Sequence, residues 1–323
     1  MRRRAAVWTP PCTPRRSLRA SRRRFVSAAV RVPAAAVLAL PMAAGCTGEG
    51  AEPRVGGPFG ARPTIVFPTA RPAAELRVDE PVAGRGEPLR TGDLAIVQYT
   101  AHVWDGAASR LVGSSFTRGT PAAFPVGELL PGLERALRGR RVGSRVTVAI
   151  PPGEGFGAAP PRGLKAGEEL FYVVDILGAH HRDDAVAAGP GELAGVRIGG
   201  GPRPSPAVPR GAPPRTFASA VLRRGAGRPV RPGMLVVAQY AGAVWRTGRV
   251  FDATWASGGP KAFKLGDGGV ISGWEKGLAG VPVGSRVAMV VPPAYGYGPS
   301  GRPEDGIEGS DTLVFVVDVI GAY

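Results

Sequence analysis

The stretch with the most distinctive chemistry runs from Val270 to Leu278, where Val-Ile-Ser-Gly leads into Trp274 and a short amphipathic turn. Trp274 and Leu278 are four residues apart, so in a helix they share one face. A single Trp on a buried face is usually part of a hydrophobic core. Here other residues before and after it in the sequence favour an apolar aromatic site. They are Tyr240, Phe251, Asp252, Phe263, Tyr295, Tyr297 and Phe315.

Metal and cofactor chemistry find little support in the same sequence. His102, His180 and His181 are too few and too badly spaced for a zinc site, and the chain has only Cys12 and Cys46. If an N-terminal signal is removed, Cys46 is the sole cysteine, which excludes an internal disulfide and a cysteine metal cluster. We therefore expect neither a metal nor a cofactor.

The order and spacing of the motifs carry a family resemblance. Val-Ile-x-Gly-Trp, an upstream Phe-Asp, a downstream Tyr-x-Tyr-Gly and a closing Leu-Val-Phe resemble the FKBP-type peptidyl-prolyl isomerases over about residues 205–323. The resemblance implies catalysis of cis–trans exchange at X-Pro bonds of unfolded or exported polypeptides. It also implies that macrolides are possible ligands.

The resemblance assigns roles residue by residue. Trp274 would form the floor under the proline ring, Asp252 would sit at the rim, and the hydroxyl of Tyr297 would hydrogen-bond the substrate. The remaining substrate-binding residues implied by the family pattern are Tyr240, Phe251, Val270, Ile271, Ile307 and Phe315. Phe263 is interpreted as core. Lys261 and Arg302 depart from the family, which usually has a further aromatic and a different flap residue there.

The implied reaction needs no nucleophile, metal or general base. Its barrier is rotation about a partial double bond, about 18–20 kcal/mol. A protein lowers that barrier by favouring the twisted amide, whose carbonyl is less polar. A dry aromatic cavity with a few placed hydrogen bonds would do this, and each ~1.4 kcal/mol gained is about tenfold in rate.

An internal repeat sets the architecture. Residues 64–99 align without a gap onto residues 205–240 at an offset of 141, and Val-Gly-Ser-Arg-Val occurs at both 142 and 283. The period is longer than that of solenoid repeats, so the chain contains a duplicated domain.

Each copy is predicted to contain several strands and one short helix. In the second copy the helix is expected over 271–278, and strands are expected over 234–240, 243–251, 262–265, 286–291 and 312–320. A sheet with a single helix packs one face on that helix, which makes each domain α+β. This agrees with the FKBP fold, an antiparallel sheet curved around one short helix.

The first copy keeps the scaffold and lacks most of the site. Phe251, Asp252, Trp274 and Tyr297 of the second copy are replaced by smaller or non-polar residues. Their counterparts are Val112, Gly113, Leu133 and Phe156, while Glu154 replaces Tyr295, Tyr172 replaces Phe315, and Tyr99 and Phe124 remain. We interpret the first copy as a degenerate domain that binds peptide or acts as a spacer.

The N-terminus predicts export. Residues 1–45 hold ten Arg and no acidic residue, and without them the net charge falls from +16 to +6, leaving 31 basic and 25 acidic residues. No basic patch is evident in the remainder, so nucleic acid is not expected as a partner. Arg22-Arg23 resembles a twin-arginine signal, and Ala43-Ala44-Gly45-Cys46 resembles a lipobox. We expect a lipid on Cys46 and anchoring at the extracytoplasmic face of the cell membrane; the alternative is a secreted soluble protein.

These observations predict five segments: a signal peptide over 1–45, a flexible linker over 46–62, a degenerate FKBP-like domain over 63–181, a Gly/Pro-rich linker over 182–204, in line with 14 Gly or Pro among residues 189–214, and an isomerase domain over 205–323. The leading function is an exported prolyl isomerase that assists folding, with activity in the second domain. The alternative is a non-catalytic chaperone lipoprotein that uses the same apolar groove.

Overall fold

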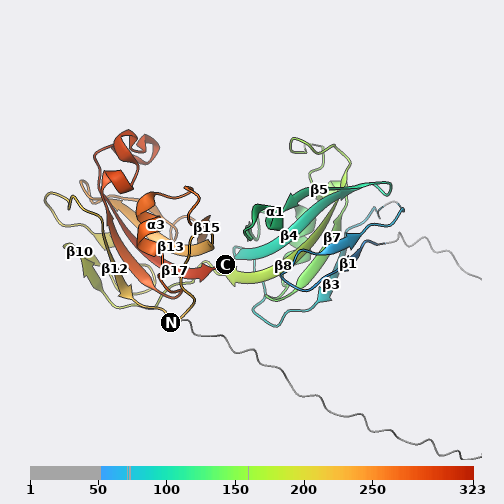
Figure 1. Ribbon diagram of the computed structural model, residues 1–323, viewed down its shortest axis with the longest axis horizontal. Helices are drawn as coiled ribbons and strands as arrows, with labels where there is room; N and C mark the ends of the chain where they lie inside the picture. Colours follow the sequence, from blue (N-terminus) through green and yellow to red (C-terminus); the bar gives the residue numbers. More distant parts are fainter. Residues whose placement is uncertain (1–51, 71, 73, 159) are drawn as a thin grey trace, which may run out of the picture. The chain divides into compact units, whose positions relative to one another are not determined.

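A computed structural model describes residues 52–70, 72, 74–158 and 160–323. The predicted signal peptide, Cys46 and the beginning of the predicted first linker lie outside the described residues. Within them the chain forms two α+β domains of the same topology, each an antiparallel sheet with a short helix against one face (Figure 1). The described helices include none that is long and apolar enough to span a bilayer.

The sheet of the second domain has the strand order β12-β16-β17-β13-β14, with β15 also paired to β13. Its strands are β12 (Ala218–Arg223), β13 (Leu235–Val244), β14 (Val250–Ala253), β15 (Lys261–Lys264), β16 (Arg286–Val291) and β17 (Leu313–Ala322). The sequence pattern divides β13 at residues 241–242, whereas the structure continues the strand through Gly242 and turns after Val244. Strand β12 was not predicted.

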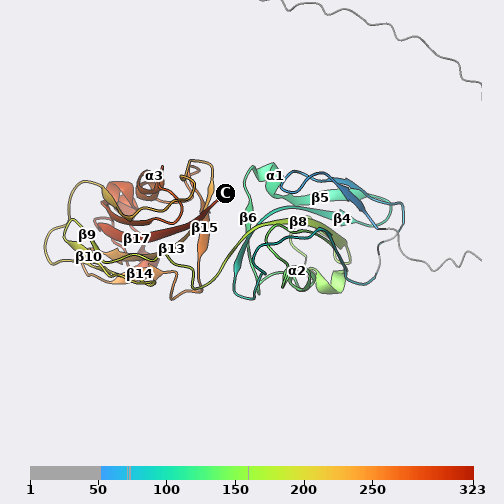
Figure 2. The same cartoon turned by 90° about the horizontal axis from the view of Figure 1, so that it is seen from below.

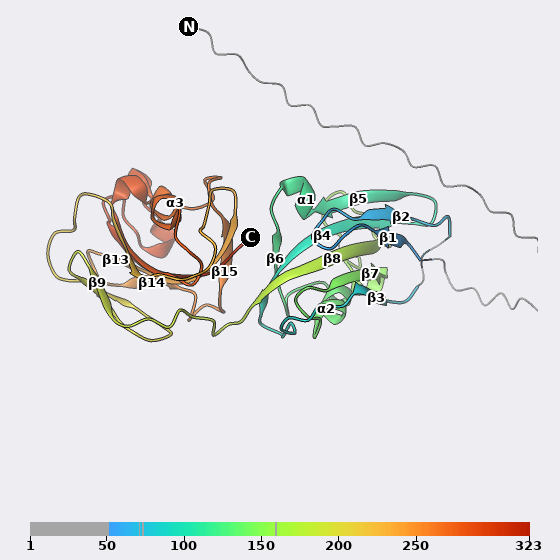
Figure 3. The same ribbon diagram turned by 60° about the horizontal axis from the view of Figure 1, so that its bottom comes forward.

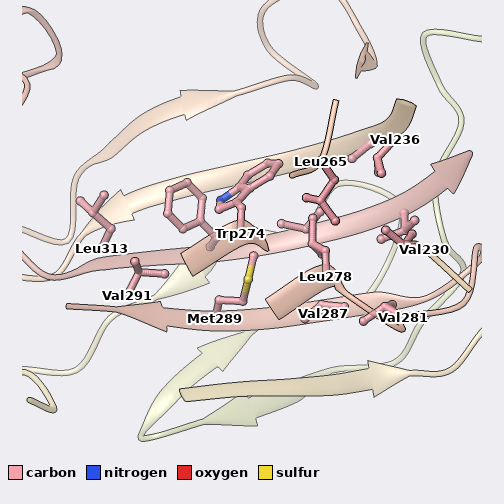
Figure 4. Packing of buried hydrophobic residues seen from close by; sticks show 14 of the residues in the cluster. Val230, Val236, Leu265, Trp274, Leu278, Val281, Val287, Met289, Val291 and Leu313 are labelled. Atoms are coloured by element: carbon pink, nitrogen blue, oxygen red, sulfur yellow. The ribbon is translucent and has the colours of Figure 1, made fainter. Parts of the chain in front are cut away.

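The helix of this domain, α3 (Ser272–Leu278), lies close against β16 because two of its residues have no side chain. A Cβ on Gly277 would lie 2.2 Å from Met289 Sδ, and one on Gly273 would lie 2.6 Å from Val291 Cγ1. With this approach, Trp274 and Leu278 both extend into the core that β16 and β17 line (Figure 4). The predicted shared face of these two residues is therefore present.

The first domain repeats the arrangement with the order β3-β7-β8-β4-β5, and β6 also pairs with β4. Its elements are β3 (Arg77–Val82), β4 (Leu94–Trp104), β5 (Ser109–Ser114), α1 (Ser115–Arg118), β6 (Ala122–Pro125), α2 (Pro131–Leu137), β7 (Arg145–Ile150) and β8 (Glu169–His180). The first domain also has a single-turn 3-10 helix, η1 (Pro152–Glu154). The second domain has three of them: η2 (Pro293–Tyr295), η3 (Gly298–Ser300) and η4 (Pro303–Asp305).

The two segments expected to be linkers differ from that expectation. The second contains β9 (Gly191–Leu193) and β10 (Val196–Ile198), which pair with β11 (Pro206–Ala207) into a small sheet. This sheet packs on the face of the second domain opposite α3, because Val196 and Ile198 bury against Ala241 and Val316 (Figure 2). Likewise β1 (Arg54–Gly56) and β2 (Thr64–Val66) form a hairpin on the outer face of the first domain (Figure 3).

A buried ion pair fixes each outer segment to its sheet. Arg286 Nε donates to Asp318 Oδ1 over 2.6 Å, Val186 N donates to Asp318 Oδ2, and Arg286 Nη2 donates to Val186 O. In the first domain Arg145 and Asp175 form the same pair, and Gly60 N donates to Asp175 Oδ2. Buried charges are tolerated when each is paired and hydrogen-bonded. The outer segments supply those extra bonds and are therefore part of each domain.

Candidate functional site

A cavity with a volume of about 690 Å³ lies in the second domain. It opens between α3, the strands β13, β14, β15 and β17, and the segment that contains Tyr297 and Arg302. Eight of the nine predicted site residues line it: Tyr240, Phe251, Asp252, Val270, Ile271, Trp274, Tyr297 and Phe315.

Ile307 is the exception among the predicted residues. Its side chain is 2% exposed and belongs to the core cluster, and it does not line the cavity. Its backbone pairs with Arg302, whose N–H donates to Ile307 O over 2.8 Å. Ile307 therefore positions the segment that bears Arg302, and we do not count it as a contact residue.

Trp274 forms the floor of the cavity and is the central ring of its aromatic cluster. Three rings meet the indole edge-on. The distances between ring centroids are 4.9 Å for Tyr240, 4.9 Å for Phe263 and 5.4 Å for Phe315, and the angles between ring planes are 89°, 71° and 90°. Edge-to-face contacts of this kind hold aromatic rings in a defined orientation. The indole is 4% exposed, so packing on all sides holds the floor of the cavity in place.

One glycine makes room for the neighbouring pair of rings. Phe251 and Phe315 meet edge-on at 5.8 Å over Gly242. A Cβ on Gly242 would lie 2.7 Å from an atom of each ring, which is too close for any side chain. Gly242 is therefore needed for the cavity wall, although no local sequence pattern predicts this role.

The rim carries a short chain of polar contacts. Tyr240 donates its hydroxyl proton to Asp252 Oδ2 over 2.6 Å, and Lys261 Nζ lies 3.8 Å from the same oxygen. Burial, followed by the neighbouring Asp252 carboxylate, raises the pKa of Tyr240 far above its ordinary value, so this phenol stays protonated. Asp252 is thus held in place by a permanent donor, with a cation beside it.

Two donors remain available to a ligand. The backbone N–H of Ile271, just before α3, has no partner among the described residues, although the carbonyl of Ile271 accepts from Trp274 N over 2.9 Å. The Tyr297 hydroxyl oxygen accepts a hydrogen bond from Arg302 Nη1 over 3.4 Å, which leaves the Tyr297 hydroxyl proton free to be donated. The Arg302 guanidinium lies 5.7 Å above the Tyr297 ring.

Some cavity residues were not predicted as site residues. Phe263, expected in the core, lines the cavity, and so does Asp305. Lys261 and Arg302, which stand where the family pattern has a pocket aromatic and a flap residue, line it as well. The position of Lys261 follows from the pairing of β15 with β13, in which Lys261 lies opposite Ala238. The residue types alone carry no signal for that pairing.

Comparison with known proteins agrees with this geometry. The family model described as FKBP-type peptidyl-prolyl cis-trans isomerase matches residues 86–177 and again residues 227–320. The chain belongs to this family. It contains two FKBP domains, and it is a peptidyl-prolyl cis-trans isomerase.

The chain is similar to curated bacterial relatives over one domain length. It is 37% identical to the FK506-binding protein of Streptomyces anulatus over 118 residues, which is 36% of this chain and 95% of the relative. It is also 37% identical to the probable FK506-binding protein of Corynebacterium glutamicum over 122 residues, covering 37% of this chain and 98% of the relative. Among solved structures, AtFKBP13 matches with 30% identity and a TM-score of 0.31, covering 36% of this chain and 98% of that one.

The first FKBP domain arranges the equivalent positions differently. Its Tyr99 has a cation as partner: Arg118 Nη2 donates to the Tyr99 hydroxyl over 3.2 Å, and the guanidinium lies 5.4 Å from the ring. Tyr99 is stacked with Tyr172 at 6.1 Å, and burial raises the pKa of Tyr172 to about 12. Leu133 occupies the place of Trp274 in α2 and is buried. At the described positions that correspond to Asp252 and Trp274, this domain therefore has Gly113 and Leu133 in place of a carboxylate and an indole.

Proposed function

We propose that the second FKBP domain carries the isomerase activity and that the first is a non-catalytic copy. The observation that carries this proposal is the cavity built on Trp274, with the oriented Asp252 at its rim and two free donors, Ile271 N–H and the Tyr297 hydroxyl. The first domain has Leu133, Gly113 and Phe156 at the corresponding positions.

The proposed mechanism uses the cavity to favour the twisted amide. The proline ring lies on the Trp274 indole between Tyr240, Phe251 and Phe315. Once the substrate fills this aromatic-walled cavity and displaces its water, the planar, dipolar amide loses more solvation than the twisted one, which lowers the barrier. Ile271 N–H and the Tyr297 hydroxyl donate to carbonyls of the substrate chain and hold its ends. Asp252 is kept in place by Tyr240 and polarises or orients the carbonyl of the bond that rotates.

The test uses the full chain and borrows its substitutions from the sibling domain. The triple variant Asp252→Gly, Trp274→Leu and Tyr297→Phe places the first domain's residues in the second domain. We expect it to remain folded by circular dichroism and to lose most activity in a protease-coupled prolyl isomerisation assay. The matched control, Tyr99→Phe with Tyr172→Phe in the first domain, should keep full activity. A folded triple variant with unchanged turnover would place the activity elsewhere.

We also propose that the protein acts outside the cytoplasm on exported polypeptides, anchored by a lipid on Cys46. The support is the sequence of residues 1–46, with Arg22-Arg23 before an apolar segment and Cys46 after small residues. Several acyl chains on one cysteine would give firm anchoring, which a single chain does not. Replacing Arg22 and Arg23 by Lys should block export at unchanged charge, and Cys46→Ala should release the protein from membranes. Membrane retention of Cys46→Ala would exclude lipidation as the anchor.

Macrolide binding is a further proposal for the second domain. The names of the similar bacterial proteins describe FK506 binding, and the cavity around Trp274 is large enough for a sizeable ligand. We expect FK506 to quench Trp274 fluorescence and to inhibit isomerisation competitively. Lys261 stands where the family usually has an aromatic residue, so the cavity offers less aromatic surface to a ligand. Lys261→Phe should therefore tighten FK506 binding. Unchanged affinity of this variant would show that Lys261 lies outside the contact area.

A further inference from the structure

A second cavity, of about 200 Å³, lies in the first FKBP domain on the face of the sheet opposite α2. Its floor is formed by Thr100 and His102 of β4, which alternate with Ala101 and Val103 on the helix-facing side. The segment around β2 covers it, with Phe67 packed against the His102 ring at 5.4 Å between centroids. The cavity is smaller than a drug-sized pocket of roughly 300–1,000 Å³, so it suits a small molecule.

The polar groups around this cavity are mainly donors. Arg62, His102, Ser109 and Ser114 line it, and the lining includes no carboxylate. Arg62 Nη2 donates to Thr117 Oγ1 over 3.2 Å, and within the described part of the chain no carboxylate forms an ion pair with it. A guanidinium without a carboxylate partner is free to bind an oxyanion through parallel N–H donors.

Two buried polar atoms at the floor are unpaired. Thr100 is 4% exposed, and its hydroxyl oxygen has no hydrogen-bond partner in the described structure. The same holds for His102 Nδ1. A buried polar group without a partner destabilises the folded state. Because neither atom is accessible to solvent, a bound ligand would offset this cost when the floor side chains turn toward it.

The sibling domain shows that the fold does not require these polar residues. Thr100 and His102 correspond to Ala241 and Ala243, since Thr100 pairs with Val173 and Ala241 with Val316 at the same point of the two sheets. Ser114 corresponds to Ala253. In the second domain this face is an apolar cluster that includes Ala241 and Ala253. The polar floor is therefore specific to the first domain.

We propose that this outer cavity of the first FKBP domain binds a small oxyanion, a carboxylate or a phosphate. Arg62 supplies the charge, and Thr100, Ser109 and Ser114 supply hydroxyl donors. Phe67 and Leu111 form apolar walls that accept a short aliphatic group attached to the anion. The site lies on the face of the first domain's sheet opposite its helix, and the proposal does not depend on where the isomerase activity resides.

The full chain contains only three histidines, which makes His102 a usable reporter. Burial lowers the pKa of His102, and a bound anion would raise it by favouring the protonated ring. In NMR spectra of ¹³C-histidine-labelled protein, propionate or inorganic phosphate should shift the His102 signals saturably and raise the His102 pKa. Sodium chloride at equal ionic strength should do neither. The stronger of the two responses identifies the ligand as carboxylate or phosphate.

Variants distinguish a site from general screening. Arg62→Ala should weaken binding about tenfold or more, because it removes a charge-assisted bond, and Thr100→Ala, which copies Ala241, should weaken it less. Arg203→Ala is the matched control: Arg203 aligns with Arg62 at the repeat offset and removes the same charge from the second domain's outer segment. Isomerase activity should stay constant in all three. The proposal fails if neither anion shifts His102 selectively, or if Arg62→Ala and Arg203→Ala behave alike.

Discussion

Trp274→Leu isolates the contribution of the cavity floor. The indole is buried and makes edge-to-face contacts with three rings at 4.9, 4.9 and 5.4 Å. Each such contact is worth about 0.5–1.5 kcal/mol beyond burial, and leucine leaves part of the indole volume empty. We expect a loss of about 2–4 kcal/mol in the free energy of unfolding, which a domain with about 5–15 kcal/mol of stability survives.

The activity of this variant should fall even when all of the protein is folded. A folded Trp274→Leu protein should show kcat/KM lower by about tenfold or more, equivalent to at least ~1.4 kcal/mol of transition-state stabilisation. The assay is protease-coupled isomerisation of an X-Pro peptide below the melting transition followed by circular dichroism. Leu133→Trp in the first domain is the reciprocal control and should add no activity, since Gly113 and Phe156 supply neither a carboxylate nor a hydroxyl. Wild-type kcat/KM in folded Trp274→Leu would refute the floor assignment.

Three further predictions follow from individual contacts. Tyr297→Phe removes one donor, worth about 0.5–1.5 kcal/mol, and should reduce kcat/KM roughly two- to twelvefold; steady-state kinetics showing no change would mean that this hydroxyl does not touch the substrate. Asp318→Asn leaves Arg286 buried without its counter-charge and should destabilise the second domain by about 3–5 kcal/mol in urea unfolding, whereas the exposed Asp183→Asn should have almost no effect. Burial raises the pKa of Glu169 from 4.5 to about 7. The folded state therefore favours the protonated acid, and the stability this contributes is present below pH 4.5 and lost as pH rises through about 7. Glu169→Gln should accordingly be more stable than wild type at pH 8, by roughly 3 kcal/mol at most, and similar at pH 4; parallel stability curves would contradict the buried-acid argument.

The sequence predicted what depends on local pattern and on the family motif. The spacing of Trp274 and Leu278 predicted the helix, and the motifs predicted most of the cavity. The outer segments were not predicted as strands, because β9 and β10 are three residues each and lie among glycines and prolines that favour a linker. Their pairing depends on long-range burial against the sheet, such as that of Val196, which no local window contains.

Contacts between neighbouring strands of the sheet could not be predicted from the local sequence either. Phe263, expected in the core, reaches the cavity through the register of β15 on β13, and that register follows from tertiary packing. Ile307 was assigned to the site by its place in the family pattern, yet its side chain points into the core. A family pattern transfers the position of a backbone better than the direction of a side chain in a variable segment.

Gly242 bears on whether the two domains could become equivalent again. Its counterpart is Ala101, which lies opposite Tyr172 as Gly242 lies opposite Phe315. The methyl group of Ala101 fills the space that an aromatic side chain at position 112 would need. A Cβ at Gly113 would lie 3.3 Å from the Tyr99 hydroxyl, the counterpart of the Tyr240 hydroxyl that hydrogen-bonds Asp252. Restoring the aromatic wall in the first domain therefore requires Ala101→Gly before an aromatic gain at position 112 is useful. A change with no benefit of its own must come first, so the divergence of the two domains is hard to reverse by single steps.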